Sequence, residues 1–129
     1  MRHVVIEPAA FLGWFGADGP GRRLREQYEQ GALIVTVPRV FALSVLEMAA
    51  LRGTWSADRL QRLASEIQHV GFELRDPPSA ELSAWLARPL NGSQAAHAAL
   101  ASALDLRLVT ADPSLLREAA SFAISPAKA

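Results

Sequence analysis

The chain has 129 residues, half of them hydrophobic, and its 13 basic and 13 acidic side chains give a formal net charge of zero. This length suggests one domain with a sizeable core, and the balanced charge argues against a protein that coats nucleic acid by charge alone. Cysteine is absent, which excludes disulfides, zinc–thiolate centres and cysteine catalysis and favours a cytoplasmic protein.

Two kinds of membrane-directed segment are not expected. The sequence contains no apolar run of the roughly 18 residues that a spanning helix needs. The apolar stretch at residues 3–6 is too short for a signal peptide. We therefore expect neither a membrane anchor nor an export signal.

Proline and glycine divide the first half of the chain into alternating strands and helices. Pro8 and Pro38 each follow a short β-rich run, and Gly31 follows a charged helical stretch. Glu7 comes directly after the first run, at the carboxyl end of the expected strand. The expected elements are strands at 3–6 and 33–37, helices at 9–15, 22–30 and 38–52, and a loop at 16–21.

The second half continues the alternation. Ser56 and Ser79 are expected to cap helices, and Pro113 prevents the last long strand from continuing past Asp112. Asp112 is either a helix cap alone or a site residue at a strand end. The expected elements are helices at 57–70, 80–88, 94–104 and 113–120, strands at 72–74 and 106–110, and an edge strand at 122–124.

This order predicts an α/β fold with a small, mostly parallel sheet between two layers of helices. We expect one domain over residues 1–125 and a short flexible tail at 126–129. In open sheets of this kind, ligands bind at the carboxyl ends of the strands. Glu7 and Asp112 are both predicted to lie at such ends.

Glu47 is the single acid of an otherwise almost entirely apolar helix at 38–52. A carboxylate in such surroundings is costly unless it is paired, protonated or bound to a cation. The alternative is that Glu47 lies with Ser44 on a narrow solvated stripe. We favour a functional role for Glu47.

Four segments carry a recognisable pattern, with the sequences VVIEPA (4–9), VPRVF (37–41) through EMA (47–49), QAAHAALA (94–101) and LVTADPSL (108–115). In order and spacing they resemble the PIN-domain family, in particular the small VapC-like toxin ribonucleases of bacterial toxin–antitoxin pairs. The last segment is the most specific of the four. The resemblance covers nearly the whole chain and implies a PIN-like fold.

The resemblance implies a cluster of four acids that hold one or two Mg²⁺ or Mn²⁺ ions and activate water against an RNA phosphodiester. Glu7 stands where the first Asp is expected, Glu47 matches the helix Glu, and Asp112 matches the last Asp. Gln94 stands where the third Asp is expected, and Thr110 matches a supporting Thr. An RNA substrate, a small antitoxin protein and a homodimer are implied in the same way.

Two of these positions depart from the pattern. Glu7 is one methylene longer than Asp, and Gln94 keeps an amide oxygen but carries no charge. Three carboxylates suit one divalent ion better than two, and Gln94 would at most ligate or orient through its amide. The resemblance therefore implies a metal-dependent ribonuclease with a degraded acidic site, and the main alternative is an inactive PIN-like module that binds an antitoxin-like protein or RNA. In a third interpretation Glu7, Glu47 and Asp112 are only caps and surface residues that lie far apart.

Two further groups of side chains have open roles. Arg22, Arg23 and Arg25 form the densest basic cluster, which is either a solvated helix face or a contact for RNA phosphates. His97 lies one helical turn from Gln94. We favour packing or a surface position for His97 over an approach to the site.

Overall fold

Five parallel strands form the central sheet of the computed structural model, which describes residues 3–15 and 20–129. The strand order is β3-β2-β1-β4-β5, so the first strand of the chain lies in the centre. The strands are β1 (Val4–Ile6), β2 (Ile34–Thr36), β3 (Glu73–Leu74), β4 (Arg107–Val109) and β5 (Ala123–Ile124). The expected α/β fold is confirmed.

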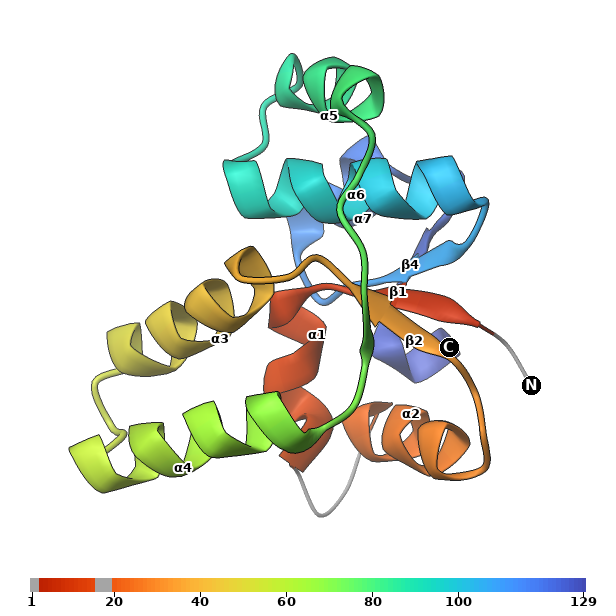
Figure 1. The fold of residues 1–129 in the computed structure, drawn as a ribbon. Helices are drawn as coiled ribbons and strands as arrows, with labels where there is room; N and C mark the ends of the chain where they lie inside the picture. The colour runs from red at the N-terminus through yellow and green to blue at the C-terminus, as the bar shows by residue number, and fades with distance from the viewer. Residues whose placement is uncertain (1–2, 16–19) are drawn as a thin grey trace.

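Helices cover both faces of this sheet (Figure 1). One layer contains α1, α2, α3 and α4, and the opposite layer contains α5, α6 and α7. Among the described helices, none is both long and apolar enough to cross a membrane. The helices are α1 (Pro8–Phe11), α2 (Pro20–Glu29), α3 (Val40–Leu51), α4 (Ala57–His69), α5 (Ser79–Leu86), α6 (Gly92–Leu104) and α7 (Pro113–Glu118), with 3-10 turns η1 (Leu12–Phe15) and η2 (Pro126–Lys128).

Two hydrophobic cores lie on the two faces of the sheet because successive strand residues point in opposite directions. Val4 and Ile6 of β1 pack with Phe11 and the first helical layer. Val5, between them, packs on the other side against the small side chains of α6, including Ala98 and Ala99. Every β1 side chain is buried, which is the pattern expected of a central parallel strand.

Several boundaries differ from the sequence prediction. The helix expected at 9–15 is α1 followed by η1, and Ser79 is the first residue of α5, with Pro78 at the N-cap. Of the loop expected at 16–21, residues 16–19 lie outside the described part of the chain, and α2 begins at Pro20. The last four residues, expected as a flexible tail, contain η2, which contacts α2.

Candidate active site at the carboxyl edge of the sheet

A cleft of about 170 Å³ lies where β1 and β4 end. Glu7 follows β1, Asp112 comes shortly after β4, Glu47 comes from α3, and Gln94 comes from the first turn of α6. All four side chains line this cleft. The structure therefore places the three predicted acids around one cavity, not far apart as in the third interpretation.

Glu7 is the buried acid of the cleft, with only 3% of its surface exposed. Its Oε1 accepts hydrogen bonds from the Thr110 hydroxyl at 2.8 Å and from the Ala9 N–H at 2.9 Å. Burial raises the pKa of Glu7 from 4.5 to about 7; the Thr110 hydrogen bond opposes this rise, and the charge of Asp112 adds to it. Glu7 therefore changes charge near neutral pH.

Asp112 caps a helix and also lines the cleft. Its Oδ1 accepts the Ser114 N–H at 2.7 Å, so Asp112 is the N-cap of α7, as the following proline predicts. Its own N–H donates to the Thr110 hydroxyl at 3.0 Å. The cap holds the carboxylate in place at the cleft.

Gln94 uses both ends of its amide within the protein. Its side-chain Oε1 accepts the backbone N–H of Asn91 at 2.9 Å. The backbone N–H of Gln94 in turn donates to Asn91 Oδ1 at 2.8 Å, which completes a capping box at the start of α6. Its Nε2 donates to Asp112 Oδ2. In this arrangement Gln94 orients Asp112, and its amide oxygen is not turned toward a ligand.

Glu47 is exposed to solvent, so the expectation of a buried acid in α3 is wrong. The reason is that α3 is apolar on its outer side as well as on its core side: Leu43 is 64% and Leu51 is 79% exposed. Apolar neighbours in the sequence therefore did not signal burial. Glu47 lines the cleft together with Ser44, on the solvated stripe of the alternative interpretation.

The side chains of the cleft are of a kind that binds divalent cations. Carboxylate oxygens are the ligands that Mg²⁺ and Mn²⁺ prefer. Within residues 3–15 and 20–129, however, no three acidic, histidine or cysteine side chains already converge as metal ligands. Glu7, Glu47 and Asp112 share the lining of the cleft, and Gln94 offers no fourth carboxylate.

His97 lies behind the cleft and is completely buried. Its Nδ1 donates to the Ser93 carbonyl at 2.8 Å, which leaves Nε2 to accept the Val37 N–H at 3.3 Å and to contact the Thr36 hydroxyl at 2.9 Å. Burial lowers the pKa of His97 from 6.5 to about 4. His97 is thus a neutral core residue, as the packing interpretation predicts.

Thr36 is a buried polar residue that the sequence did not single out. Its hydroxyl lies 3.1 Å from the Ile6 carbonyl and 2.9 Å from His97 Nε2. Through Thr36, His97 links the start of α6 to the carboxyl ends of β1 and β2. A threonine within a β-rich run carries no sequence signal for such a contact.

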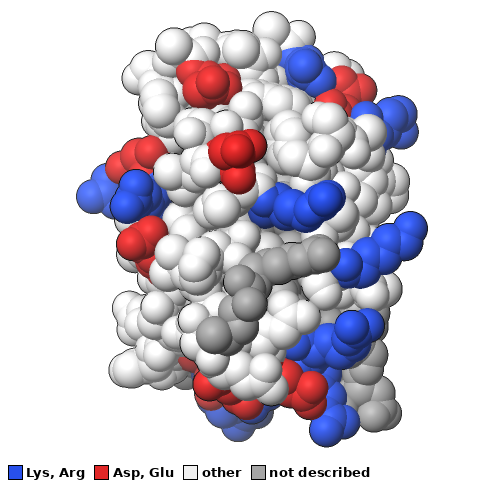
Figure 2. All heavy atoms as spheres, turned by 90° about the vertical axis from the view of Figure 1, so that its right-hand side faces the viewer, with Lys and Arg blue, Asp and Glu red and all other residues white. Residues whose placement is uncertain are grey.

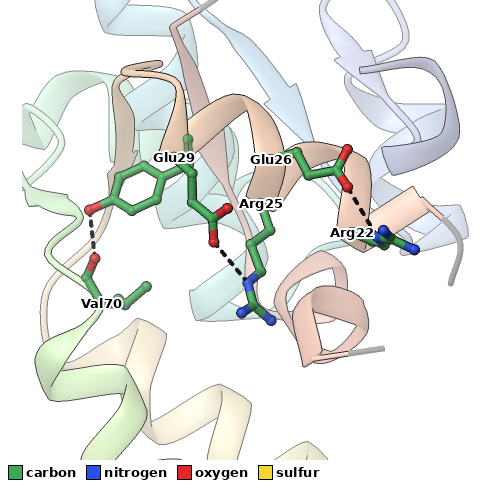
Figure 3. Close-up of polar contacts among 6 residues, drawn as sticks. Arg22, Arg25, Glu26, Glu29 and Val70 are labelled. Atoms are coloured by element: carbon green, nitrogen blue, oxygen red, sulfur yellow. Dashed lines mark hydrogen bonds and ion pairs between the residues drawn. The ribbon is translucent and has the colours of Figure 1, made fainter. Parts of the chain in front are cut away.

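The arginine cluster of α2 is a charged, solvated helix face. Arg22 pairs with Glu26 at 3.0 Å and Arg25 pairs with Glu29 at 3.3 Å, each one turn apart along the helix (Figure 3). Basic and acidic side chains also lie side by side near the lower end of the face shown in Figure 2. Local pairing therefore accounts for two arginines of this cluster without an RNA phosphate.

Comparison with known proteins gives a structural match only. No protein-family model and no curated protein matches the chain at a significant level. Among solved structures, the chain is similar to the crystal structure of PAE2754 from Pyrobaculum aerophilum, a PIN-domain protein, with a TM-score of 0.72 and 16% sequence identity over 97% of this chain and 90% of that one. This likeness, together with the parallel strand order, shows that the fold is PIN-like.

Proposed function

We propose that this protein is a divalent-metal-dependent ribonuclease of the PIN-domain type, similar to the VapC-like toxins of toxin–antitoxin pairs. The observation that carries the proposal is the position of Glu7, Glu47 and Asp112, which lie far apart in the sequence yet line one cleft. That cleft lies at the carboxyl edge of a parallel sheet, where α/β proteins place their ligands. The PIN-like fold adds support for nuclease chemistry.

Glu7, Glu47 and Asp112 are the residues that would hold one Mg²⁺ or Mn²⁺ ion. When bound, such an ion supplies a water of lowered pKa as nucleophile and charge compensation for the phosphate. Thr110 holds the carboxylate of Glu7, and Gln94 holds that of Asp112. Without a cation, the carboxylates would repel an RNA phosphate, so we expect the cation to be required for substrate binding as well as for cleavage.

The alternative is a PIN-like module that binds an antitoxin-like protein or RNA without cutting it. The contact between Gln94 Nε2 and Asp112 Oδ2 favours it, because this contact partly neutralises Asp112 without a metal. The raised pKa of Glu7 acts in the same direction, because a protonated Glu7 contributes less negative charge. Affinity for Mn²⁺ distinguishes the two functions.

The partners follow from the same resemblance, the location follows from the absence of cysteine, and both are part of the proposal. A small antitoxin and a second copy of the chain are the protein partners, and the cytoplasm is the compartment. The exposed Leu43 and Leu51 on α3 are consistent with a protein partner, because apolar side chains gathered on one helix face are favourable contact surfaces.

The decisive experiment measures cleavage of single-stranded RNA by the purified protein in Mn²⁺, in Mg²⁺ and in a chelator. Glu47→Gln and Asp112→Asn test the cleft. Glu66→Gln and Asp76→Asn are matched controls, because they remove exposed acids outside it. We expect metal-dependent cleavage by the wild type and by both controls, and a loss of at least tenfold in both cleft variants.

Equal cleavage by all variants would point to a contaminating ribonuclease and would contradict the proposal. Absence of cleavage together with absence of Mn²⁺ binding in calorimetry would favour the non-cleaving module. Binding of Mn²⁺ without cleavage would place the defect after metal binding and would also contradict the ribonuclease. A Gln94→Asp variant would then show whether the scaffold can cut once a fourth carboxylate is present.

A further inference from the structure

A second and larger cavity, of about 290 Å³, lies at the start of α3. Phe41 and Ala42 line this cavity, whereas Ser44 and Glu47 of the same helix line the carboxylate cleft. Its walls come from the end of β2, the start of α3, the end of α4 and β3. Most of the lining is apolar, and Phe41 and Phe72 are its buried aromatic residues.

Arg39 gives this apolar cavity a positive charge. It is the one cationic side chain among the lining residues that the structure describes, and none of those residues is acidic. Arg39 is exposed, and within the described chain its guanidinium has no ion-pair partner. A cavity of this composition favours a ligand with an apolar body and an anionic end.

The backbone at Arg39, a residue that lines the cavity, is strained. Arg39 has φ 64° and ψ −59°, and the Val40 N–H donates across it to the Pro38 carbonyl at 2.7 Å, which is the rare strained form of the γ-turn. A residue other than glycine held in such a conformation costs about 1–3 kcal/mol. The chain nevertheless carries a long cationic side chain there.

We propose that this cavity binds a small carboxylate with an apolar body, such as a medium-chain fatty acid. The carboxylate pairs with Arg39, and the apolar body packs against Phe41 and Phe72. The volume lies just below the roughly 300–1,000 Å³ of small-molecule pockets, which favours a short ligand. The proposal does not depend on the carboxylate cleft or on ribonuclease activity.

Octanoate is the probe, and its binding to the full chain is measured by calorimetry and by tryptophan fluorescence. Trp14 is a suitable reporter because its ring lies 5.2 Å from that of Phe72. Arg39→Lys keeps the charge, Arg39→Gln removes the charge but keeps the strained position, and Arg39→Gly removes both. Arg62→Gln is the matched control, because Arg62 is an exposed arginine that lines a different cavity.

We expect octanoate to bind the wild type, Arg39→Lys and Arg62→Gln with similar affinity, and to bind Arg39→Gln and Arg39→Gly at least tenfold more weakly. Octanol, which lacks the charge, should bind the wild type more weakly than octanoate does. Arg39→Gly should also melt at a higher temperature than the wild type, because glycine relieves the strained turn. A gain in stability together with a loss of binding separates a ligand-binding role from a structural one.

Three results would overturn the proposal. They are absence of saturable octanoate binding by the wild type at millimolar concentration, equal affinity in Arg39→Gln, and equal affinity for octanol. An Arg39→Gly variant that is less stable than the wild type would show instead that the arginine is retained for the fold. A Glu47→Gln variant should bind octanoate normally, so failure of the ribonuclease proposal leaves this test intact.

Discussion

The hydroxyl of Thr110 connects the two acids that follow neighbouring strands. It donates to Glu7 Oε1 at 2.8 Å and accepts the N–H of Asp112 at 3.0 Å. Thr110 is completely buried, so water cannot replace either contact. One threonine thus fixes the carboxyl ends of β1 and β4 relative to each other.

Thr110→Val should destabilise the protein by about 1–3 kcal/mol, because it keeps the shape but leaves Glu7 Oε1 and the Asp112 N–H each without one partner. Urea unfolding monitored by circular dichroism measures the change. Thr110→Ser, which keeps the hydroxyl, is the control and should lose less. A valine variant as stable as the wild type would show that the hydroxyl bridge contributes nothing to the fold.

Glu7 should make the metal-free protein less stable as the pH rises. Its pKa is about 7 in the folded protein and 4.5 when unfolded, so the folded state binds the proton more tightly. This stabilisation is fully present below pH 4.5 and is lost as the pH rises through about 7, a difference of about 3 kcal/mol. Because His97 acts in the opposite direction over nearly the same pH range, the wild type should change little between pH 4.5 and 6.5. Unfolding in chelator should therefore show stability that rises with pH in Glu7→Gln, and a Glu7→Gln variant with the wild-type dependence would contradict the assignment.

His97 should make the protein more stable as the pH rises, which is the opposite of the effect of Glu7. Its pKa is about 4 in the folded protein and 6.5 when unfolded, so the unfolded state binds the proton more tightly. The stabilisation is fully present above pH 6.5 and is lost as the pH falls through about 4, again by about 3 kcal/mol. In His97→Gln, stability should fall with rising pH between these values, because Glu7 then acts alone. If the stability of His97→Gln rises with pH, a group other than His97 is responsible for the loss of stability at low pH.

Gln94→Asp should lower the stability of the metal-free protein and raise its affinity for Mn²⁺. The shorter acid loses the hydrogen bond to Asp112 and the contact with the Asn91 N–H, and it places a like charge near Asp112, so we expect a loss of about 1–3 kcal/mol in chelator. Added Mn²⁺ should raise the melting temperature of this variant more than that of the wild type. Gln61→Asp on the exposed face of α4 is the control and should show no extra response to Mn²⁺. The same response in both variants would argue against a metal site at Gln94.

Gly21→Ala should be strongly destabilising, by about 1–3 kcal/mol or more, because an added Cβ would lie 2.1 Å from the carbonyl oxygen of Gly13. This contact is between backbone segments, so η1 and α2 would have to separate. Gly92→Ala is the matched control, since a Cβ there meets nothing within 4 Å. Thermal unfolding of the two variants checks the difference, and similar melting temperatures would show that η1 and α2 separate easily.

The strand ends were predictable because the chemistry that fixes them is local. Pro8 and Pro113 stop their strands, and the acid before each proline caps the helix that follows. Parallel pairing then brings Glu7 and Asp112 to one edge of the sheet. This is why a short sequence pattern sufficed to place two of the three predicted acids correctly.

Other features depend on contacts that no local pattern encodes. The exposure of Glu47 was mispredicted because composition does not reveal which side of an apolar helix lacks a covering element. The contact between His97 and Thr36 joins residues 61 positions apart. The strained turn at Arg39 follows a proline that equally predicts an ordinary helix start.

The central position of β1 has a consequence for how the chain acquires its fold. Val5 pairs with Val35 on one side and with Leu108 on the other, so one neighbour of β1 is synthesised soon after it and the other much later. Until β4 emerges from the ribosome, one edge of the nascent sheet remains open, and pairing between such distant segments is slow. During this interval a chaperone or a binding partner has its best access to the unpaired backbone edge of β1.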